Sequence, residues 1–174
     1  MPCKVKINFD NELTQVFNRR AGFERMNRVL EDSIRKSRVF SIALIDIDHF
    51  KQINDIYGHA TGDSILKIIA TDLDNLLRGS EIFFRHGGEE FIVCMPETTL
   101  NEAKVIAERL RIRVASEKVI SSTGESLGVT LSLGISVFPE HGTHLEQLIH
   151  ASDEAMYEAK KSGRNCVKVA SKVN

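Results

Sequence analysis

The chain lacks an excess of charge of either sign. Its 174 residues carry 23 Lys and Arg against 24 Asp and Glu, which gives a net charge of -1. Because no polybasic face is present, the composition argues against a nucleic-acid partner and against contact of this domain with an anionic membrane. We therefore expect charge to act locally, within a site.

Cysteines and long apolar runs are also scarce. The three cysteines, Cys3, Cys94 and Cys166, are odd in number and far apart, which fits neither a disulfide framework nor a paired-thiolate zinc site. No apolar run is long enough to span a bilayer, and the first residues lack the apolar core of a signal peptide. These absences favour a cytoplasmic location. The length suits one domain that buries roughly 70% of the surface of its unfolded chain.

Hydrophobic periodicity predicts alternating helices and strands. Asn18 is a capping-type residue, and apolar side chains from Phe23 to Ile34 follow it at helical spacing. The β-branched run 39–48 is typical of a strand buried on both faces. We predict an α/β (α+β) fold with a central mixed, mostly antiparallel sheet flanked by helices. The predicted elements are a helix over 18–36, a strand over 39–48, a short and a long helix over 49–78, a hairpin around 87–88, a helix over 101–118, a strand over 129–138, a helix over 145–161 and a short strand near 167.

Four acidic residues follow or begin these strands. Asp46 and Asp48 lie where the first strand ends, and Glu89 and Glu90 follow Gly87-Gly88, a dipeptide suited to the positive φ of a tight hairpin turn. If the two strands are neighbours, the carboxylates converge on a site for Mg²⁺, which prefers hard oxygen ligands and substrate phosphates. The alternative is that each pair ends a strand or is simply exposed.

Positive charge for phosphate is available at two places. Lys51 follows the acidic strand end, and the segment AKKSGRN carries Lys160 and Arg164 at the end of the last long helix. A lysine gives a point charge and an arginine a planar fork, which together suit a triphosphate. Helix C-termini attract cations in any case, so Lys160 alone carries little weight.

Three segments together carry a family resemblance. DIDHFKQINDIYGHATGD, RHGGEEF and EAMYEAKKSGRN resemble the GGDEF domain of the diguanylate cyclases, a bacterial signalling family, in order and approximate spacing. The resemblance runs from about Asn11 to Val169, so we interpret residues 11–174 as one catalytic domain and 1–10 as the remnant of a linker. It implies a sheet like those of nucleotide cyclases and polymerase palms. It also implies that two GTP molecules condense to cyclic di-GMP and release two pyrophosphates.

The resemblance assigns roles to residues that match the family motifs. Asp46, Glu89 and the backbone carbonyl of Ile47 match ligands of Mg²⁺, for which Mn²⁺ is an alternative, and Glu90 matches an acid that helps with the metal or with the attacking 3′-hydroxyl. Gly88 has to stay small so that nucleotide and metal can approach. Phosphate contacts match Lys51, Lys160, Arg164 and the backbone N–H groups near His49 and Phe50.

Two further positions match readers of the guanine base. The Asp63 carboxylate can accept from guanine N1–H and N2–H₂, whereas adenine presents an acceptor at N1, and Asn54 is the second reader. The alternative for Asp63 is an ordinary acid at a helix N-terminus. Because the product has two identical halves, the resemblance also implies a catalytic homodimer.

The chain departs from the family at two places. The usual Asp-x-Leu-Thr-Gly opening reads Asn11 to Gln15 here, which weakens a tether to an upstream sensory domain. A product-inhibition site matches Arg78 and Glu81, where a surface ion pair or a solvated helix end is the alternative. Two rival functions are a catalytically silent receptor for GTP or cyclic di-GMP, which turnover would exclude, and a dimerisation scaffold, which Mg²⁺-dependent GTP binding would exclude.

Overall fold

The computed structural model describes residues 10–77 and 79–172, and their main feature is a five-stranded sheet in the order β2-β3-β1-β6-β7. All neighbours are antiparallel except β6 and β7, which are parallel. The strands of this sheet are β1 (Phe40–Ile47), β2 (Ile82–Arg85), β3 (Glu90–Pro96), β6 (Leu131–Phe138) and β7 (Cys166–Val169). The helices are α1 (Arg19–Lys36), α2 (Phe50–Tyr57), α3 (His59–Leu76), α4 (Leu100–Ser116) and α5 (Leu145–Lys161).

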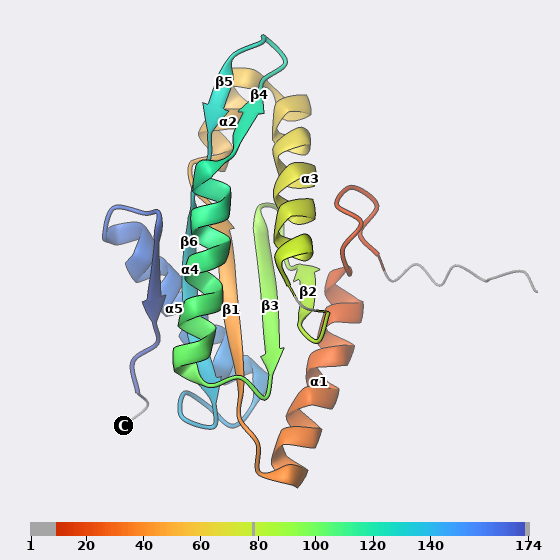
Figure 1. Cartoon of the computed structure of the whole chain (residues 1–174), viewed down its shortest axis with the longest axis vertical. Helices are drawn as coiled ribbons and strands as arrows, with labels where there is room; N and C mark the ends of the chain where they lie inside the picture. The colour runs from red at the N-terminus through yellow and green to blue at the C-terminus, as the bar shows by residue number, and fades with distance from the viewer. Residues whose placement is uncertain (1–9, 78, 173–174) are drawn as a thin grey trace, which may run out of the picture.

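Helices cover both faces of the sheet, which explains why the central strand is apolar throughout. All eight residues of β1 are buried. Ala43 and Ile45 face the core under α3 and α4, whereas Ile42 and Leu44 face the core under α1 and α5. The predicted mixed, mostly antiparallel sheet between helices is confirmed (Figure 1).

α1 begins and ends where its sequence indicates. The Asn18 side chain accepts a hydrogen bond from the backbone N–H of Ala21 at 3.0 Å, and Ser37 closes the helix in the left-handed conformation. Met26 is fully buried, but Ile34, the last apolar residue at this helical spacing, is 59% exposed. The last turn of α1 extends past the region that packs on β2, which leaves Ile34 without cover.

A second, two-stranded sheet was not predicted. It consists of β4 (Lys118–Ile120) and β5 (Ser126–Gly128), and α4 ends at Ser116, two residues before the predicted end. Each strand has only three residues, and only Val119 is fully buried. Such short strands carry too little alternation to be told from a loop. In Figure 1 this hairpin lies beside α2 and α3 at the upper end of the molecule.

The predicted linker falls almost entirely on residues that the structure does not describe. The linker predicted for residues 1–10 lies outside the described residues except for Asp10, which forms an isolated bridge with Phe17. Within the described residues, no helix is both long and apolar enough to cross a membrane.

Candidate functional site

Two acidic residues lie directly opposite each other at one end of the sheet. β1 and β3 are neighbours, which is the condition for their carboxylates to converge, and the register pairs Asp46 with Glu90. Residues that pair in this way point to the same face of a sheet. Asp46 is buried and Glu90 half-buried, so two carboxylates share a partly dehydrated space. Figure 1 shows the end of β1 and the turn between β2 and β3 at the same end of the sheet.

Lys160 supplies the positive charge at this point. Its Nζ lies 3.0 Å from Oδ2 of Asp46, and it comes from the last turn of α5. Burial still raises the pKa of Asp46 to about 6, because Lys160 only partly opposes it and the charges of Glu89 and Glu90 add to the rise. Burial likewise raises the pKa of Glu90, and Lys160 again opposes the shift. One ammonium group therefore does not balance the three carboxylates.

The turn that carries Glu89 is wider than predicted. The backbone N–H groups of His86 and Gly87 both donate to the carbonyl of Glu90, which closes a loop of several residues. Neither Gly87 nor Gly88 has a positive φ, so the prediction of a tight turn that requires one is wrong. Longer hairpin loops are commonly built on turns that do not need left-handed residues. A Cβ atom on Gly88 would meet nothing within 4 Å, so the surface beside this residue is open.

Arg85 holds this loop in place, a role that the sequence did not suggest. Its Nη2 donates to the carbonyl of Gly88 at 2.7 Å, and its Nε donates to the carbonyl of Gly87 at 3.1 Å. Its Nη1 lies 3.3 Å from Oδ1 of Asn11. The backbone N–H of Ile47 also donates to the carbonyl of Glu89 at 3.3 Å. The loop is thus tied to the N-terminal segment and to the end of β1.

Asp48 does not join the acidic group. Its carboxylate accepts from the hydroxyls of Thr130 and Ser132, each at 2.6 Å, and from the backbone N–H of Asn165 at 3.0 Å. These bonds join β1 to β6 and to the loop that follows α5. Because Arg164 precedes Asn165 in that loop, with a φ of 64°, Asp48 positions a predicted phosphate contact instead of a metal.

The remaining predicted phosphate contacts follow β1. Phe50 is buried and begins α2, and Lys51 is exposed in the first turn of that helix. His49 precedes them in the left-handed conformation, with a φ of 58°, and its side chain makes no capping hydrogen bond. The first backbone N–H groups of α2 have no partners within the helix, as at any helix start, and can bind an anion.

The predicted base readers lie on two adjoining helices. Asn54 is in the last turn of α2, and its Oδ1 is buried without a hydrogen-bond partner among the described residues. Asp63 is exposed on α3. Since α3 begins at His59, Asp63 lies in the second turn, so its alternative reading as a helix N-terminal acid is wrong. An amide oxygen without a partner in the described part of the chain and an exposed carboxylate on the adjoining helix suit a ligand edge rich in N–H groups.

Other predicted positions are less well defined. Arg78 lies outside the described residues, and Glu81 is half-buried with the Ser80 hydroxyl 3.3 Å from its Oε2. The product-inhibition site therefore stays a prediction. The His86 ring packs against Phe23, with 5.9 Å between the ring centroids.

The acidic end suits a divalent cation that substrate phosphates help to hold. The donors are carboxylate oxygens, and burial raises the pKa values of Asp46 and Glu90, with a further contribution from the neighbouring carboxylates. A bound cation would stabilise their charged forms. Between residues 10 and 172, with residue 78 set aside, no three Asp, Glu, His or Cys side chains are close enough to hold a metal ion. Mg²⁺ typically takes only one or two carboxylates beside phosphates, so this arrangement fits it.

Comparisons with known proteins agree with this geometry. The family model "Diguanylate cyclase, GGDEF domain" matches residues 8–166. The diguanylate cyclase DosC of Escherichia coli K12 is 40% identical over 157 residues, which cover 90% of this chain and 34% of DosC. The response regulator PleD of Caulobacter vibrioides is 40% identical over 164 residues, which cover 94% of this chain and 36% of PleD.

A solved structure extends the likeness to the fold. The GGDEF domain of PA1120 (YfiN or TpbB) from Pseudomonas aeruginosa superposes with a TM-score of 0.87 and 34% identity, over 92% of this chain and 99% of that domain. The chain spans about a third of the length of DosC and PleD. The matched family and the shared fold lead to one conclusion: the chain belongs to the GGDEF domain family of diguanylate cyclases.

Proposed function

We propose that this domain condenses two GTP molecules into cyclic di-GMP and releases two pyrophosphates. The observation that carries the proposal is the pairing of Asp46 with Glu90 at the sheet end, beside Glu89 and with Lys160 as the nearby cation. Family membership supports the same reaction. Each 3′-hydroxyl attacks an α-phosphorus, and pyrophosphate leaves.

Asp46 and Glu89, with the carbonyl of Ile47, would hold Mg²⁺ or Mn²⁺ beside the substrate phosphates, and Glu90 would assist with the metal or with the attacking hydroxyl. The cation, when bound, polarises the phosphate oxygens and offsets the charge that develops on them. Glu90 has the raised pKa expected of a carboxylate that accepts a proton from the attacking hydroxyl. Lys160 neutralises Asp46 in the free domain and turns to the phosphates when a cation takes over that role.

Phosphate and base are bound by residues on either side of the acidic end. Lys51, Arg164 and the first N–H groups of α2 contact the triphosphate, and Asp48 holds the Arg164 loop in place. Asn54 and Asp63 read guanine with an acceptor oxygen each. The open surface beside Gly88 leaves room for the nucleotide.

Catalysis needs two copies of the domain, because each GTP presents its hydroxyl to the other. We therefore place the active unit in a homodimer with the nucleotide sites face to face. Mass action then makes specific activity rise with protein concentration, and a flat dependence in the dilute range would contradict the dimer. The greater length of the relatives supports an upstream sensory domain that controls this association in the cytoplasm.

The decisive experiment is incubation of the purified domain with GTP and Mg²⁺, followed by chromatography of the products. We expect cyclic di-GMP from the wild type and almost none from Glu89→Ala or Glu90→Ala. GTP binding without turnover in the wild type, at concentrations that allow dimers, would favour the silent receptor instead.

A further inference from the structure

The two helices that carry the base readers meet at an elbow. α2 ends at Tyr57, α3 begins at His59, and Gly58 between them has a φ of 86°. Asn54 is in the last turn of α2 and Asp63 in the second turn of α3. The angle between the helices therefore sets the spacing between the two side chains.

The β4–β5 hairpin contacts this elbow through a closed set of hydrogen bonds. The carbonyl of Tyr57, the last residue of α2, accepts from the hydroxyls of Thr61 and Ser122, each at 3.0 Å. The Thr61 hydroxyl in turn accepts from the backbone N–H of Ser122 at 3.0 Å. Each helix of the elbow is thus bonded to the same hairpin tip.

The two helices pack directly against each other beside Asn54. Thr61 is buried, and the next residue, Gly62, lies against the reader on the other helix: a Cβ atom there would be 1.9 Å from Oδ1 of Asn54. A shift of α3 along α2 therefore moves Asn54 directly. The hairpin is itself anchored, because Val119 of β4 is buried in the core under the sheet.

We propose that the β4–β5 hairpin is a clamp that sets the base selectivity of the nucleotide site. Thr61 and Ser122 are its positioning residues, since neither is expected to contact the base. They hold α2 and α3 at the spacing at which Asn54 and Asp63 fit the edge of guanine together. The inference rests on the proposed function, because it requires guanine to bind between these two readers.

The test compares binding of guanosine and inosine 5′-diphosphates by titration calorimetry with Mg²⁺, because neither diphosphate can react. Inosine lacks the 2-amino group, so the ratio of the two affinities reports how well Asp63 meets the base edge. Thr61→Val keeps the side-chain shape without the hydroxyl, and Ser122→Ala removes its partner. We expect each of these two substitutions to lower the ratio of the guanosine to the inosine diphosphate affinity about 10-fold, the equivalent of one hydrogen bond. The value of kcat at saturating GTP should change less than about 2-fold, because the acidic end is untouched.

Two matched variants separate the clamp from general damage to the fold. Thr61→Ser keeps the hydroxyl and should restore the ratio. Thr123→Ala removes a hydroxyl of the same hairpin tip that contacts Ser121 at 2.9 Å within the hairpin, and it should leave the ratio unchanged. Weaker binding of both diphosphates by the same factor in Thr61→Val and Ser122→Ala would indicate a merely structural role and overturn the clamp.

Failure of the clamp differs from failure of the proposed function. Equal binding of both diphosphates by the wild type, or a wild-type ratio in Asp63→Asn, would show that the proposed guanine site is wrong. The clamp proposal would then be overturned as well. If Asp63→Asn lowers the ratio while Thr61→Val and Ser122→Ala do not, the guanine site stands and the clamp alone is overturned.

Discussion

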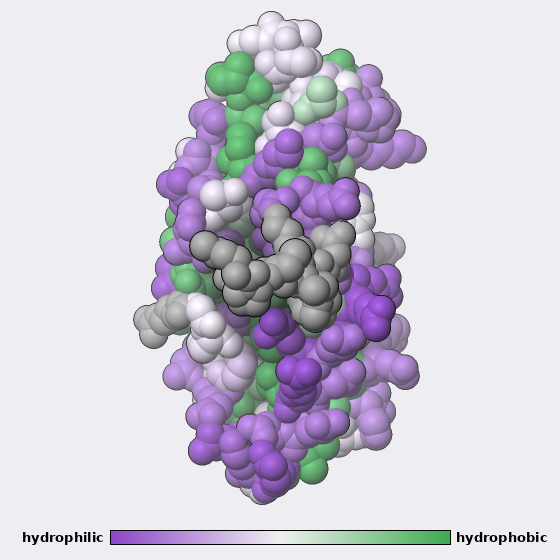
Figure 2. Space-filling model, turned by 90° about the vertical axis from the view of Figure 1, so that its right-hand side faces the viewer, coloured by the Kyte–Doolittle hydropathy of each residue, from purple (hydrophilic) through white to green (hydrophobic). Residues whose placement is uncertain are grey.

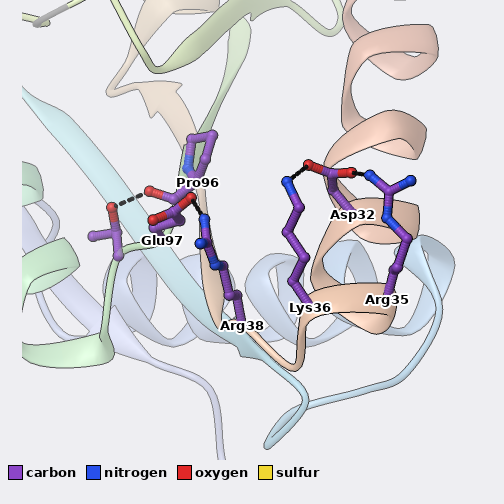
Figure 3. A network of polar contacts seen from close by, with 7 residues as sticks. Asp32, Arg35, Lys36, Arg38, Pro96 and Glu97 are labelled. Atoms are coloured by element: carbon purple, nitrogen blue, oxygen red, sulfur yellow. Dashed lines mark hydrogen bonds and ion pairs between the residues drawn. The ribbon is translucent and has the colours of Figure 1, made fainter.

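Charged side chains lie at both ends of the main sheet, but the carboxylates and cations are paired differently at the two ends. At one end a groove of about 520 Å³ lies between the C-terminal half of α1 and the end of β3. Figure 3 shows its charges in pairs: Asp32 with Lys36 and Arg35, and Arg38 with Glu97. In Figure 2 hydrophilic side chains cover the lower part of this face, where α1 ends. Each carboxylate of these pairs has its own cation and free access to water.

At the other end three carboxylates share one close ammonium group. The hydrogen bond from Lys36 lowers the pKa of Asp32 in the groove, whereas burial raises the pKa of Asp46 to about 6. A groove of this volume is large enough for a small-molecule ligand. The comparison teaches that unbalanced charge, and not the volume of a groove, marks the place where we propose that a cation and phosphates bind.

The largest expected difference between the ends is in turnover. Asp46→Asn and Asp32→Asn remove one negative charge each without a change of shape. We expect Asp46→Asn to lower kcat about 100- to 1000-fold, because a cation loses its buried ligand. Asp32→Asn should stay within about 2-fold. Chromatographic measurement of cyclic di-GMP checks both, and equal losses would show that the comparison misplaces the site.

The next effect concerns the base. Asp63→Ser removes the carboxylate that accepts from guanine and leaves a small hydroxyl that adenine tolerates. We expect the ratio of kcat/KM for GTP over ATP to fall about 10- to 100-fold, the loss expected for a hydrogen bond to one charged group. An unchanged ratio in a turnover assay with each nucleotide would count against Asp63 as a reader.

Much of this arrangement could be predicted from local patterns. The run that became β1 is apolar and β-branched over its whole length, and its neighbour β3 follows a Gly-Gly dipeptide, so their acidic ends were expected to meet. Asp48 looked the same as Asp46 in sequence. Only the structure shows that its partners come from β6 and from the loop after α5, 82 to 117 residues away.

The parts that escaped prediction depend on distant contacts between small polar residues. The bond between Thr61 and Ser122 joins residues 61 apart, and a serine in a loop carries no signal for such a partner. The strands of the β4–β5 hairpin could not be predicted because, at three residues each, they are too short to show an alternating pattern. Arg85 was overlooked because its partners are backbone carbonyls of the loop beside it.

At the acidic end, the substitution that lowers activity should raise stability. The ordinary pKa of Asp46 is 3.8 and burial raises it to about 6, so between these values the unfolded chain releases a proton that the folded domain keeps. Stability of the metal-free domain therefore falls as pH rises through this window, and the loss is complete above it. Asp46→Asn removes this loss. We expect it to raise the free energy of unfolding by about 1–3 kcal/mol at pH 8 and by clearly less at pH 5, measured by urea denaturation with EDTA.

The smallest effect belongs to the paired end. Arg38 and Glu97 form an ion pair in which both side chains are about half exposed, at 48% and 63%. Exposed pairs contribute little, because water screens them and two long side chains lose freedom. A double-mutant cycle with Arg38→Gln and Glu97→Gln should give a coupling energy below about 1 kcal/mol, with less at 1 M salt and no change in turnover. A larger coupling that persists in salt would mean that this end, too, holds its charges away from water, and the contrast between the two ends would then disappear.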